Sequence, residues 1–219
     1  MPRLLFEKTG AAIWISHLDL MRLFQRAFKR AGLPLTHTQG FNPRPSVSIA
    51  LPLSVGVESK CELLDFDLDG DNVPLDEICV RLNNALVPGV RVLRVYDDGR
   101  KLKELALLEC SIVLEYDKGV PQDAVQQIAK LFTQESLPVA KKTKNGIQEQ
   151  DILPMIRNLE VKTRSENEVE LRAAVCAQNP TLNPAQLPAA INRYLPDCAP
   201  DHSKCTRVEV YDTQNTVFR

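Results

Sequence analysis

The sequence has few aromatic residues and no long apolar segment. Aromatic side chains make up 5 % of its 219 residues, with one tryptophan, so the core must consist mainly of Leu, Val, Ile and Ala. No uninterrupted apolar run reaches the roughly 20 residues that a membrane-spanning helix needs. Charged residues also occur among the first eight positions, which argues against a signal peptide. We therefore expect a cytoplasmic protein without membrane contact.

Motifs that mark common catalytic and cofactor sites are also missing. The sequence contains no GxxxxGK[ST], GxGxxG, GxSxG or HExxH pattern, and no cysteine cluster that could hold an iron–sulfur centre. Its six cysteines are scattered without a CxxC pair, so we expect reduced and mostly buried thiols. Cys198, His202 and Cys205 are soft zinc ligands, but a closed site needs a fourth ligand, and a loop with incidental cysteines is the preferred interpretation. The sequence therefore assigns no catalytic residue, no cofactor and no metal.

The hydrophobic pattern of the first half predicts the element order β-α-β-β-α-β. Apolar residues at helical spacing follow Ser16, which is expected to cap a helix, with Asp19 completing a shortened capping box. Gly32 and Pro34 are expected to end this helix. The other expected elements are a first strand, straight or bent, within residues 4–15, strands over 47–57, 61–68 and 90–96, and a helix that starts at 74–77 and stops at 88–89.

The second half repeats this order with an insertion. Expected strands cover residues 106–116, 137–142, 159–164, 169–177 and 206–211, and expected helices cover 121–134 and 183–195. Asn145-Gly146 signals a hairpin, residues 151–156 predict a helical turn, and Asn183 with Pro184 is expected to start the last helix. The order β-α-β-β-α-β is the ferredoxin-like motif. The predicted fold class is α+β, with two tandem ferredoxin-like lobes over residues 1–98 and 99–219, the second with an inserted hairpin.

The net charge of −1 conceals an uneven distribution. Residues 1–60 carry eight Lys or Arg against three acids, for a net charge of +5, whereas residues 61–100 carry four against nine, for −5. Four cations share one side of the first helix, namely Arg22, Arg26, Lys29 and Arg30. Such a stripe can bind RNA phosphates, or it can be a solvated helix face balanced by the acidic segment.

Residues 37–46 form the most function-like segment. It contains a titratable side chain, two amides, an aromatic ring and a cation, which are His37, Gln39, Asn42, Phe41 and Arg44. Its two prolines stiffen the loop and reduce the ordering cost of binding. Phe41 could stack on a base, Arg44 could bind a phosphate, and the amides could read a base edge. The alternative is a structured connection whose phenylalanine fills a local core.

Two further candidates come from local charge patterns. Lys141, Lys142 and Lys144 form a basic hairpin tip that could contact RNA, or an exposed turn kept soluble by its charge. An Asp near a His can orient the imidazole for acid–base work. His17 and Asp19, however, are two residues apart and would face different sides of a helix. A helix-capping role is preferred for that segment.

Three motifs carry a family resemblance. Residues 4–10 are Leu-Leu-Phe-Glu-Lys-Thr-Gly, residues 15–22 are Ile-Ser-His-Leu-Asp-Leu-Met-Arg, and residues 40–45 are Gly-Phe-Asn-Pro-Arg-Pro. With Asp-Ile-Leu-Pro at residues 151–154, they resemble the radical-SAM-linked domain family of unknown function. Its members occur within, or are encoded beside, cobalamin-binding radical-SAM proteins, often near an E/G-type ribonuclease. The resemblance implies a bacterial accessory module in an RNA-related setting, with a radical-SAM protein as partner.

Three functional hypotheses follow. The first is a non-catalytic module that binds RNA, such as tRNA or rRNA, and acts with a radical-SAM partner in RNA modification or processing. The second is a protein–protein scaffold without nucleic-acid contact, docking through the acidic residues 62–71. The third is an enzyme with His37 or His17 as general acid or base.

Overall fold

The computed structural model describes residues 1–70, 73–143 and 146–219. The chain divides into two compact units, Met1–Glu104 with Arg219, and Leu105–Phe218. The sequence-based boundary after residue 98 lies within the first unit. The described residues form a mixed α+β structure with antiparallel strand pairing and four α-helices, as the predicted fold class requires at this level. None of these helices combines the length and apolar character that crossing a bilayer requires.

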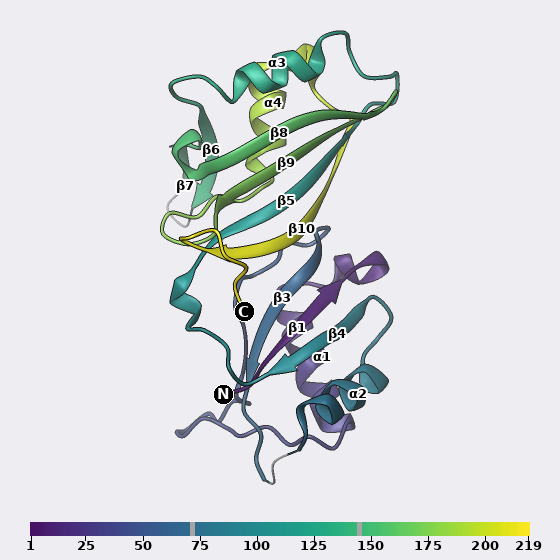
Figure 1. Cartoon of the computed structure of the whole chain (residues 1–219), viewed down its shortest axis with the longest axis vertical. Helices are drawn as coiled ribbons and strands as arrows, with labels where there is room; N and C mark the ends of the chain where they lie inside the picture. Colours follow the sequence, from purple (N-terminus) through teal and green to yellow (C-terminus); the bar gives the residue numbers. More distant parts are fainter. Residues whose placement is uncertain (71–72, 144–145) are drawn as a thin grey trace. The chain divides into compact units, whose positions relative to one another are not determined.

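The first unit is an antiparallel sheet with both of its α-helices on one side (Figure 1). Its elements are β1 (Arg3–Lys8), a 3₁₀ helix (Gly10–Trp14), α1 (His17–Arg30), β2 (Val47–Ile49), β3 (Glu58–Phe66), α2 (Leu75–Ala85), β4 (Val90–Tyr96) and a second 3₁₀ turn (Leu102–Glu104). Within the unit, β4 pairs with β1, β1 with β3, and β3 with β2, all antiparallel. The strand order is therefore β4-β1-β3-β2.

Alternating strand residues bury one sheet face against these helices. Leu4 and Phe6 of β1 pack with Phe24 and Phe28 of α1 and Leu82 of α2 in one hydrophobic cluster. The Phe6 and Phe24 rings meet edge to face, 4.7 Å between centroids, which adds a geometric preference to the area they bury. This packing fixes α1, and with it the direction in which its cations point.

The predicted start of α1 is confirmed by its hydrogen bonds. The Ser16 hydroxyl accepts a hydrogen bond from the Asp19 backbone N–H at 3.2 Å, satisfying one of the free donors at the helix start. The Ser16 hydroxyl donates to the Asp19 carboxylate at 2.7 Å. After the helix, Gly32 has a φ of +66°, a left-handed conformation that glycine adopts without steric cost.

Two strands of the first unit are shorter than the sequence predicted. The strand expected over residues 47–57 ends at Ile49, because Pro52 has no N–H for a ladder and Gly56 donates instead to the carbonyl of Ile13 at 2.9 Å. The apolar residues 11–15 do not extend the first strand. They lie mostly in the 3₁₀ helix, which begins at Gly10 with a φ of +55°.

The second unit has the same succession of elements with an added hairpin. Its elements are β5 (Leu105–Glu115), α3 (Ala124–Leu131), β6 (Pro138–Thr143), β7 (Gly146–Asp151), a 3₁₀ turn (Leu153–Met155), β8 (Ile156–Ser165), β9 (Glu168–Cys176), α4 (Gln186–Tyr194), another 3₁₀ turn (Pro196–Cys198) and β10 (His202–Asp212). Here β10 pairs with β5, β5 with β9, and β9 with β8, all antiparallel, while β6 and β7 pair only with each other.

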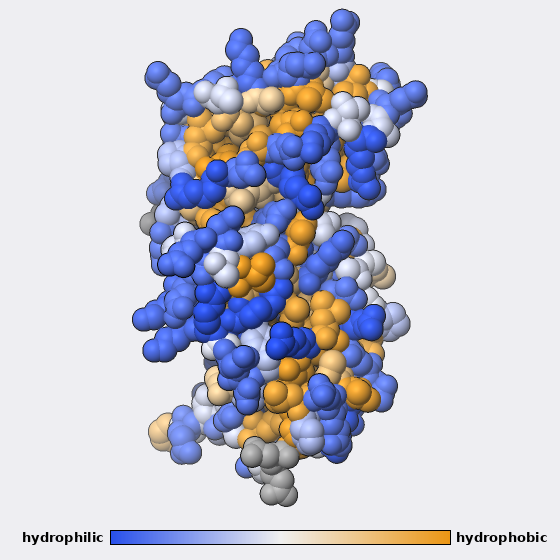
Figure 2. All heavy atoms as spheres, viewed as in Figure 1, coloured by the Kyte–Doolittle hydropathy of each residue, from blue (hydrophilic) through white to orange (hydrophobic). Residues whose placement is uncertain are grey.

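The sheet of the second unit has one helix-covered face and one open face. In β9, the side chains of Val169, Leu171, Ala173 and Val175 are buried, and the residues between them are more exposed. Cys176, the last residue of the strand, is also buried. The space-filling view shows hydrophobic residues gathered between α3 and β8, where the helical layer meets the sheet (Figure 2). The open face can therefore carry polar side chains without disturbing the core.

The helices of the second unit are shorter than predicted. The helix expected over residues 183–195 begins at Gln186, and Asn183 is not its cap. The Asn183 side-chain oxygen accepts a hydrogen bond from the Ala185 N–H at 3.1 Å, which forms a turn before the helix. The helix expected over 121–134 covers Ala124–Leu131, after Asp123 at a φ of +59°. All six cysteines are free thiols, and four of them are buried.

Candidate functional site

The loop between α1 and β2 is a small hairpin fastened to the end of β3. Thr36 donates its backbone N–H to the Asp67 carbonyl and its hydroxyl to the Asp67 carboxylate, both at 3.0 Å. Ser46 N–H donates to the Thr36 carbonyl at 2.8 Å, and Thr38 N–H donates to the Arg44 carbonyl at 2.9 Å. These bonds order the base of the loop before any partner binds.

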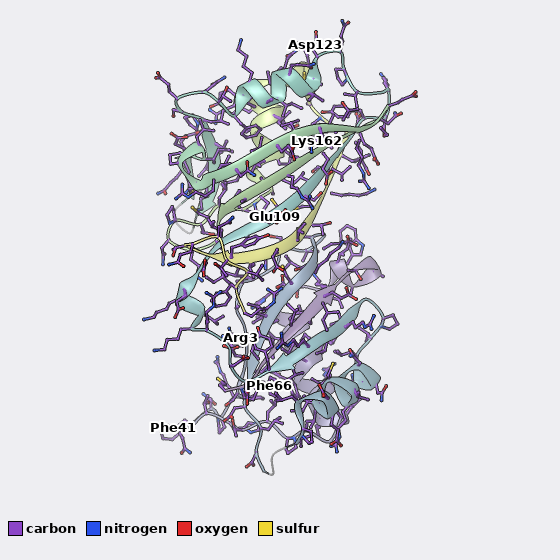
Figure 3. The ribbon with its side chains drawn as sticks, in the orientation of Figure 1. Arg3, Phe41, Phe66, Glu109, Asp123 and Lys162 are labelled. Atoms are coloured by element: carbon purple, nitrogen blue, oxygen red, sulfur yellow. The ribbon has the colours of Figure 1, made fainter. Side chains whose placement is uncertain are left out.

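The tip of this loop projects into solvent. Gln39, Phe41, Asn42 and Arg44 are all exposed, and Phe41 is fully so. Figure 3 shows the Phe41 side chain at the outer end of the loop. The alternative in which this ring fills a local core is therefore wrong. A fully exposed phenylalanine on a braced loop is available for a stacking contact.

A groove joins this loop to the basic helix within the first unit. It has a volume of about 570 Å³ and is lined by Gln25, Arg26, Phe28, Lys29, Gly32, Leu33, Pro34, Leu35, His37 and Pro45. We call it the α1 groove. Phe28, Leu33 and Leu35 are buried apolar side chains, whereas Arg26, Lys29 and His37 are exposed. The groove therefore combines an apolar floor with a rim of cationic and titratable groups.

The other two cations of α1 do not line the groove. Arg22 forms an ion pair with Asp19 at 2.9 Å, one helical turn back. Arg30 donates from Nη2 to the Ala85 carbonyl at 2.6 Å, satisfying a carbonyl at the end of α2. The predicted stripe thus divides into two groove cations, Arg26 and Lys29, and two cations with contacts elsewhere.

The basic hairpin is only partly described. Lys141 is half-buried on β6, and the backbone of Lys142 continues that strand. Lys144 lies outside the described residues. The predicted β6–β7 hairpin is present, and its predicted RNA contacts stay a prediction.

The His17 and Asp19 pair is not arranged for acid–base chemistry. The hydrogen bond from Ser16 and the one from Arg22 lower the pKa of the Asp19 carboxyl. Both carboxylate oxygens are thereby used at the helix start, where Ser16 caps the helix, so the segment has the capping role preferred from the sequence.

No metal centre is found in the described parts of the chain, where no three His, Cys, Asp or Glu side chains are grouped as ligands. The Cys198 thiol points to the Gln127 side-chain oxygen at 3.6 Å, while His202 is exposed at the start of β10. Burial raises the pKa of the Cys198 thiol, which disfavours the thiolate that a metal would need.

The acidic segment that could serve a scaffold is not a continuous exposed face. Glu62 is buried, and Asp65 pairs with the Arg3 guanidinium at 2.5 Å. Within the described part of residues 62–71, Asp67 and Asp69 are the exposed acids, and the Asp67 carboxylate accepts from Thr36. Much of the segment's negative charge is therefore used inside the first unit.

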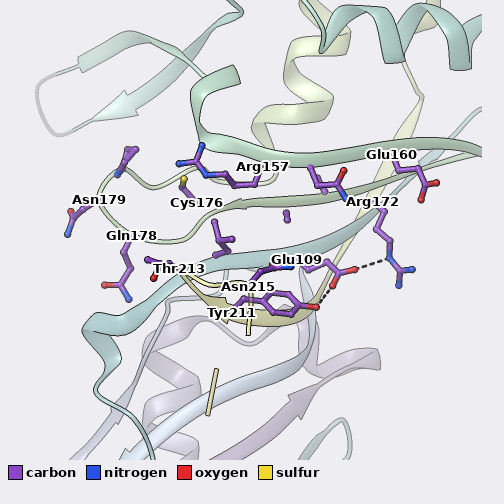
Figure 4. A pocket seen from close by; sticks show the side chains of 16 residues that line it. Glu109, Arg157, Glu160, Arg172, Cys176, Gln178, Asn179, Tyr211, Thr213 and Asn215 are labelled. Carbon is purple, nitrogen blue, oxygen red and sulfur yellow. Dashed lines mark hydrogen bonds and ion pairs between the residues drawn. The ribbon is translucent and has the colours of Figure 1, made fainter. Parts of the chain in front are cut away.

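Sequence reasoning missed a cavity of about 740 Å³ on the open sheet face of the second unit (Figure 4). Among its lining residues, the Glu109 carboxylate pairs with Arg172 at 3.0 Å and accepts from the Tyr211 hydroxyl at 2.7 Å. This hydrogen bond raises the pKa of Tyr211 to about 12, so the phenol stays protonated at neutral pH. The lining residues come from segments far apart in the sequence, and no local motif signals them.

Comparison with known proteins identifies a family and a fold. The family described as "Uncharacterized protein conserved in bacteria (DUF2344)" matches residues 2–184. No curated protein matches the chain. A chain in the crystal structure of a Cbf5-Nop10-Gar1 complex is similar, with a TM-score of 0.54 and 10 % identity over 95 % of this chain and 48 % of that chain.

A second similar chain is in a structure of an H/ACA RNP bound to a substrate RNA containing 2′-deoxyuridine. Its TM-score is 0.47 with 11 % identity, over 94 % of this chain and 46 % of that chain. The chain therefore spans about half the length of these solved chains. At such low identity, the first likeness concerns the fold alone, and the second is too weak to support an argument.

Proposed function

We propose that this chain, which belongs to the DUF2344 family of uncharacterized proteins conserved in bacteria, binds RNA through the α1 groove of its first unit. The observation that carries the proposal is that two separate sequence candidates line one groove. Arg26 and Lys29 come from the basic helix, and His37 and Pro45 come from the proline-braced loop.

The groove offers the two kinds of contact that single-stranded RNA needs. The exposed Arg26 and Lys29 can neutralise backbone phosphates, which supply most of the affinity in such complexes. The apolar floor around Leu33 and Leu35 can accept an unstacked base, and Phe41 can stack on a neighbouring one. Because the loop base is already hydrogen-bonded, little ordering cost accompanies binding.

We further propose that the chain acts as a non-catalytic accessory to a radical-SAM protein in RNA modification or processing. The resemblance of residues 4–10, 15–22 and 40–45 supports this role. The two units are proposed to be tandem ferredoxin-like domains with a boundary near residue 98. The strand orders β4-β1-β3-β2 and β10-β5-β9-β8 support that assignment. In each unit, leaving the added hairpin aside, the sheet contains the fourth, first, third and second strand of that unit, in this order.

The other two hypotheses have less structural support. A scaffold docking through residues 62–71 would need acids that are instead engaged within the first unit, such as Asp65. A His37 general base would need a group to orient its imidazole, and none of the described residues forms a hydrogen bond or ion pair with that side chain.

Fluorescence anisotropy with labelled single-stranded RNA, and with a mixed tRNA and rRNA pool, tests RNA binding. We expect the affinity to fall between 50 and 200 mM salt, as for any complex dominated by phosphate contacts. Arg26→Ala and Lys29→Ala should each weaken binding about 3- to 10-fold and make the salt dependence shallower by roughly one counterion.

Arg91→Ala is the matched control, since it removes an exposed cation of β4 that does not line the groove. It should leave the affinity within about twofold of the original value. Binding weaker than micromolar without salt dependence, or equal losses in the groove variants and the control, would refute the proposal.

A further inference from the structure

The open sheet face of the second unit carries a cavity that is independent of the α1 groove. Its residues come from the start of β5, the start of β8, the end of β9, the loop after β9 and the end of β10 (Figure 4). At about 740 Å³, it falls within the range of ordinary small-molecule sites. Strands of one sheet supply part of its lining and hold those side chains at fixed spacing, and the segments that follow β9 and β10 supply the rest.

The lining of this cavity includes a small side chain, Ala174, and a carboxylate, Glu109, whose two oxygens are both engaged. Ala174 lies opposite Glu109 in the β5–β9 register, so the two side chains share the open face. The Glu109 carboxylate uses one oxygen for Arg172 and the other for Tyr211. The Tyr211 hydroxyl is thereby anchored, and the Tyr211 ring and the small Ala174 side chain both line the cavity.

The charges around the cavity leave one cation without an opposite charge. Arg172 pairs with Glu109, and Glu160 pairs with Lys162 at 2.7 Å. Arg157 is exposed at the bulge where β8 begins and donates from Nη1 to the Pro154 carbonyl at 2.8 Å. Within residues 1–70, 73–143 and 146–219, no carboxylate pairs with this guanidinium. The cavity therefore has a local excess of positive charge at Arg157.

Most of the remaining polar side chains of the cavity are carboxamides. Asn158, Gln178, Asn179 and Asn215 line the cavity, and each carboxamide has both a donor and an acceptor end. Such groups complement the edges of nucleobases, which alternate donors and acceptors. The combination of a small Ala174 side chain, an anchored aromatic ring, carboxamides and a guanidinium that no carboxylate of the described residues neutralises matches a base joined to a phosphate.

We propose that this cavity binds a nucleoside 5′-monophosphate group, either as a free nucleotide or as the 5′-terminal residue of an RNA. Arg157 binds the phosphate through a charge-assisted pair of hydrogen bonds, the carboxamides contact the base edge, and Tyr211 packs against the base. This site does not depend on the RNA-binding function proposed for the α1 groove, because no residue is shared between the two.

Isothermal titration calorimetry with AMP, GMP, CMP and UMP tests the proposal on the full chain. At least one nucleotide should bind with a Kd below about 1 mM, and its unphosphorylated nucleoside should bind more weakly. Arg157→Ala should weaken nucleotide binding about tenfold, since it removes the phosphate contact. The matched control is Arg164→Ala, which removes an exposed arginine of the same strand that pairs with Glu168 and does not line the cavity.

A second variant tests the cavity by filling it. Ala174→Leu should abolish nucleotide binding while leaving RNA binding at the α1 groove unchanged, and circular dichroism melts check that both variants remain folded. Oligonucleotides with a 5′-phosphate or a 5′-hydroxyl distinguish the two sources of the ligand. Arg157-dependent preference for the 5′-phosphate, without binding of any free nucleotide, assigns the site to an RNA end.

Absence of binding by all four nucleotides and by the 5′-phosphorylated RNA would overturn the proposal. So would binding that Arg157→Ala and Ala174→Leu both leave intact. RNA binding that the α1 groove variants leave unchanged would overturn the proposed function and leave this site standing.

Discussion

The two units insert extra chain at the same point in their succession of elements, and they use it differently. Residues 31–46 lie between α1 and β2 in the first unit, and residues 132–155 lie between α3 and β8 in the second. The first insertion forms hydrogen bonds to the end of β3 through Asp67. The second forms its own two-stranded sheet from β6 and β7.

The two insertions also differ in their contacts with the neighbouring helix, and among the described residues the first has a groove beside that helix. In the second unit the hairpin is tied to α4, because the Tyr194 hydroxyl donates to the Pro138 carbonyl at 2.7 Å and Arg193 pairs with Glu149 at 2.9 Å. In the first unit the insertion runs beside α1 and leaves the α1 groove between them. The second insertion is thus held against a helix, whereas the first leaves beside α1 the groove that we propose binds RNA.

The units also differ in the burial of a cross-strand ion pair. In the first, the Arg3 guanidinium contacts both carboxylate oxygens of Asp65 and donates to the Arg100 carbonyl. Burial lowers the pKa of Arg3, but the hydrogen bond and charge of Asp65 outweigh it, so the pKa lies above its ordinary value. The side chain of Arg3 is 6 % exposed, whereas that of Arg172, paired with Glu109, is 56 % exposed.

The largest effect is therefore expected at Arg3. Arg3→Ala should reduce the free energy of unfolding of the first unit by about 3 kcal/mol, because it leaves a poorly solvated carboxylate without its partner. Arg172→Ala should cost the second unit less than about 1 kcal/mol, as usual for exposed pairs. Urea unfolding, followed by hydrogen exchange of the strand amides in each unit, measures both. Equal costs at the two positions would show that burial does not distinguish the pairs.

A smaller effect is expected at the hairpin of the second unit. The Asp151 carboxylate accepts from the backbone N–H groups of Leu137 at 2.9 Å and Leu153 at 3.2 Å. Asp151→Ala should reduce the free energy of unfolding by about 1 kcal/mol at neutral pH, since charged acceptors strengthen such bonds but solvent screens this site. Hydrogen exchange of β6 and β7 locates the loss.

The same variant has a defined pH dependence. The hydrogen bond from Leu137 lowers the pKa of Asp151 below its ordinary value of 3.8. The stabilisation is therefore complete above the unfolded-state pKa and disappears as the pH falls through the lower native pKa. The difference between the original protein and Asp151→Ala should be constant above about pH 5 and shrink below it. A difference that grows on acidification would contradict this assignment.

The succession of helices and strands could be predicted from the sequence because each element has its own periodicity. Apolar residues at helical spacing after Ser16 identified α1, and the cap was predicted from side-chain chemistry alone. The predicted ends of helices and strands were wrong where local backbone chemistry opposed the hydrophobic pattern. Asn183 bonds to Ala185 and delays α4, and Pro52 interrupts the second strand.

The candidate site was predictable in parts but not as a whole. The basic helix and the loop at residues 37–46 stood out by composition, yet only the fold determines that Arg26 and Lys29 meet His37 while Arg22 and Arg30 do not. The cavity of the second unit had no signal, because its lining is assembled from five segments across more than a hundred residues. A site whose residues are brought together by strand pairing can be identified only when the register of those strands is known.

The smallest effects on stability are expected at the two insertion tips, and they test the comparison most directly. Phe41 is fully exposed and Ile147 of β7 is 77 % exposed. Phe41→Ala and Ile147→Ala should therefore each change the free energy of unfolding by less than about 0.5 kcal/mol. The two variants should differ in RNA affinity. Phe41→Ala removes the ring that we propose stacks on a base and should weaken RNA binding about tenfold, whereas Ile147→Ala should leave it unchanged.

Anisotropy titrations of both variants against the same single-stranded RNA give the answer. An undiminished affinity of Phe41→Ala would mean that the loop tip is not a stacking platform, whatever the α1 groove contributes. Equal weakening in both variants would mean that the β6–β7 hairpin also contacts RNA, as its lysines first indicated. In that case the two insertions would share a function despite their different structures, because exposure at the tip would matter more than how each insertion is anchored.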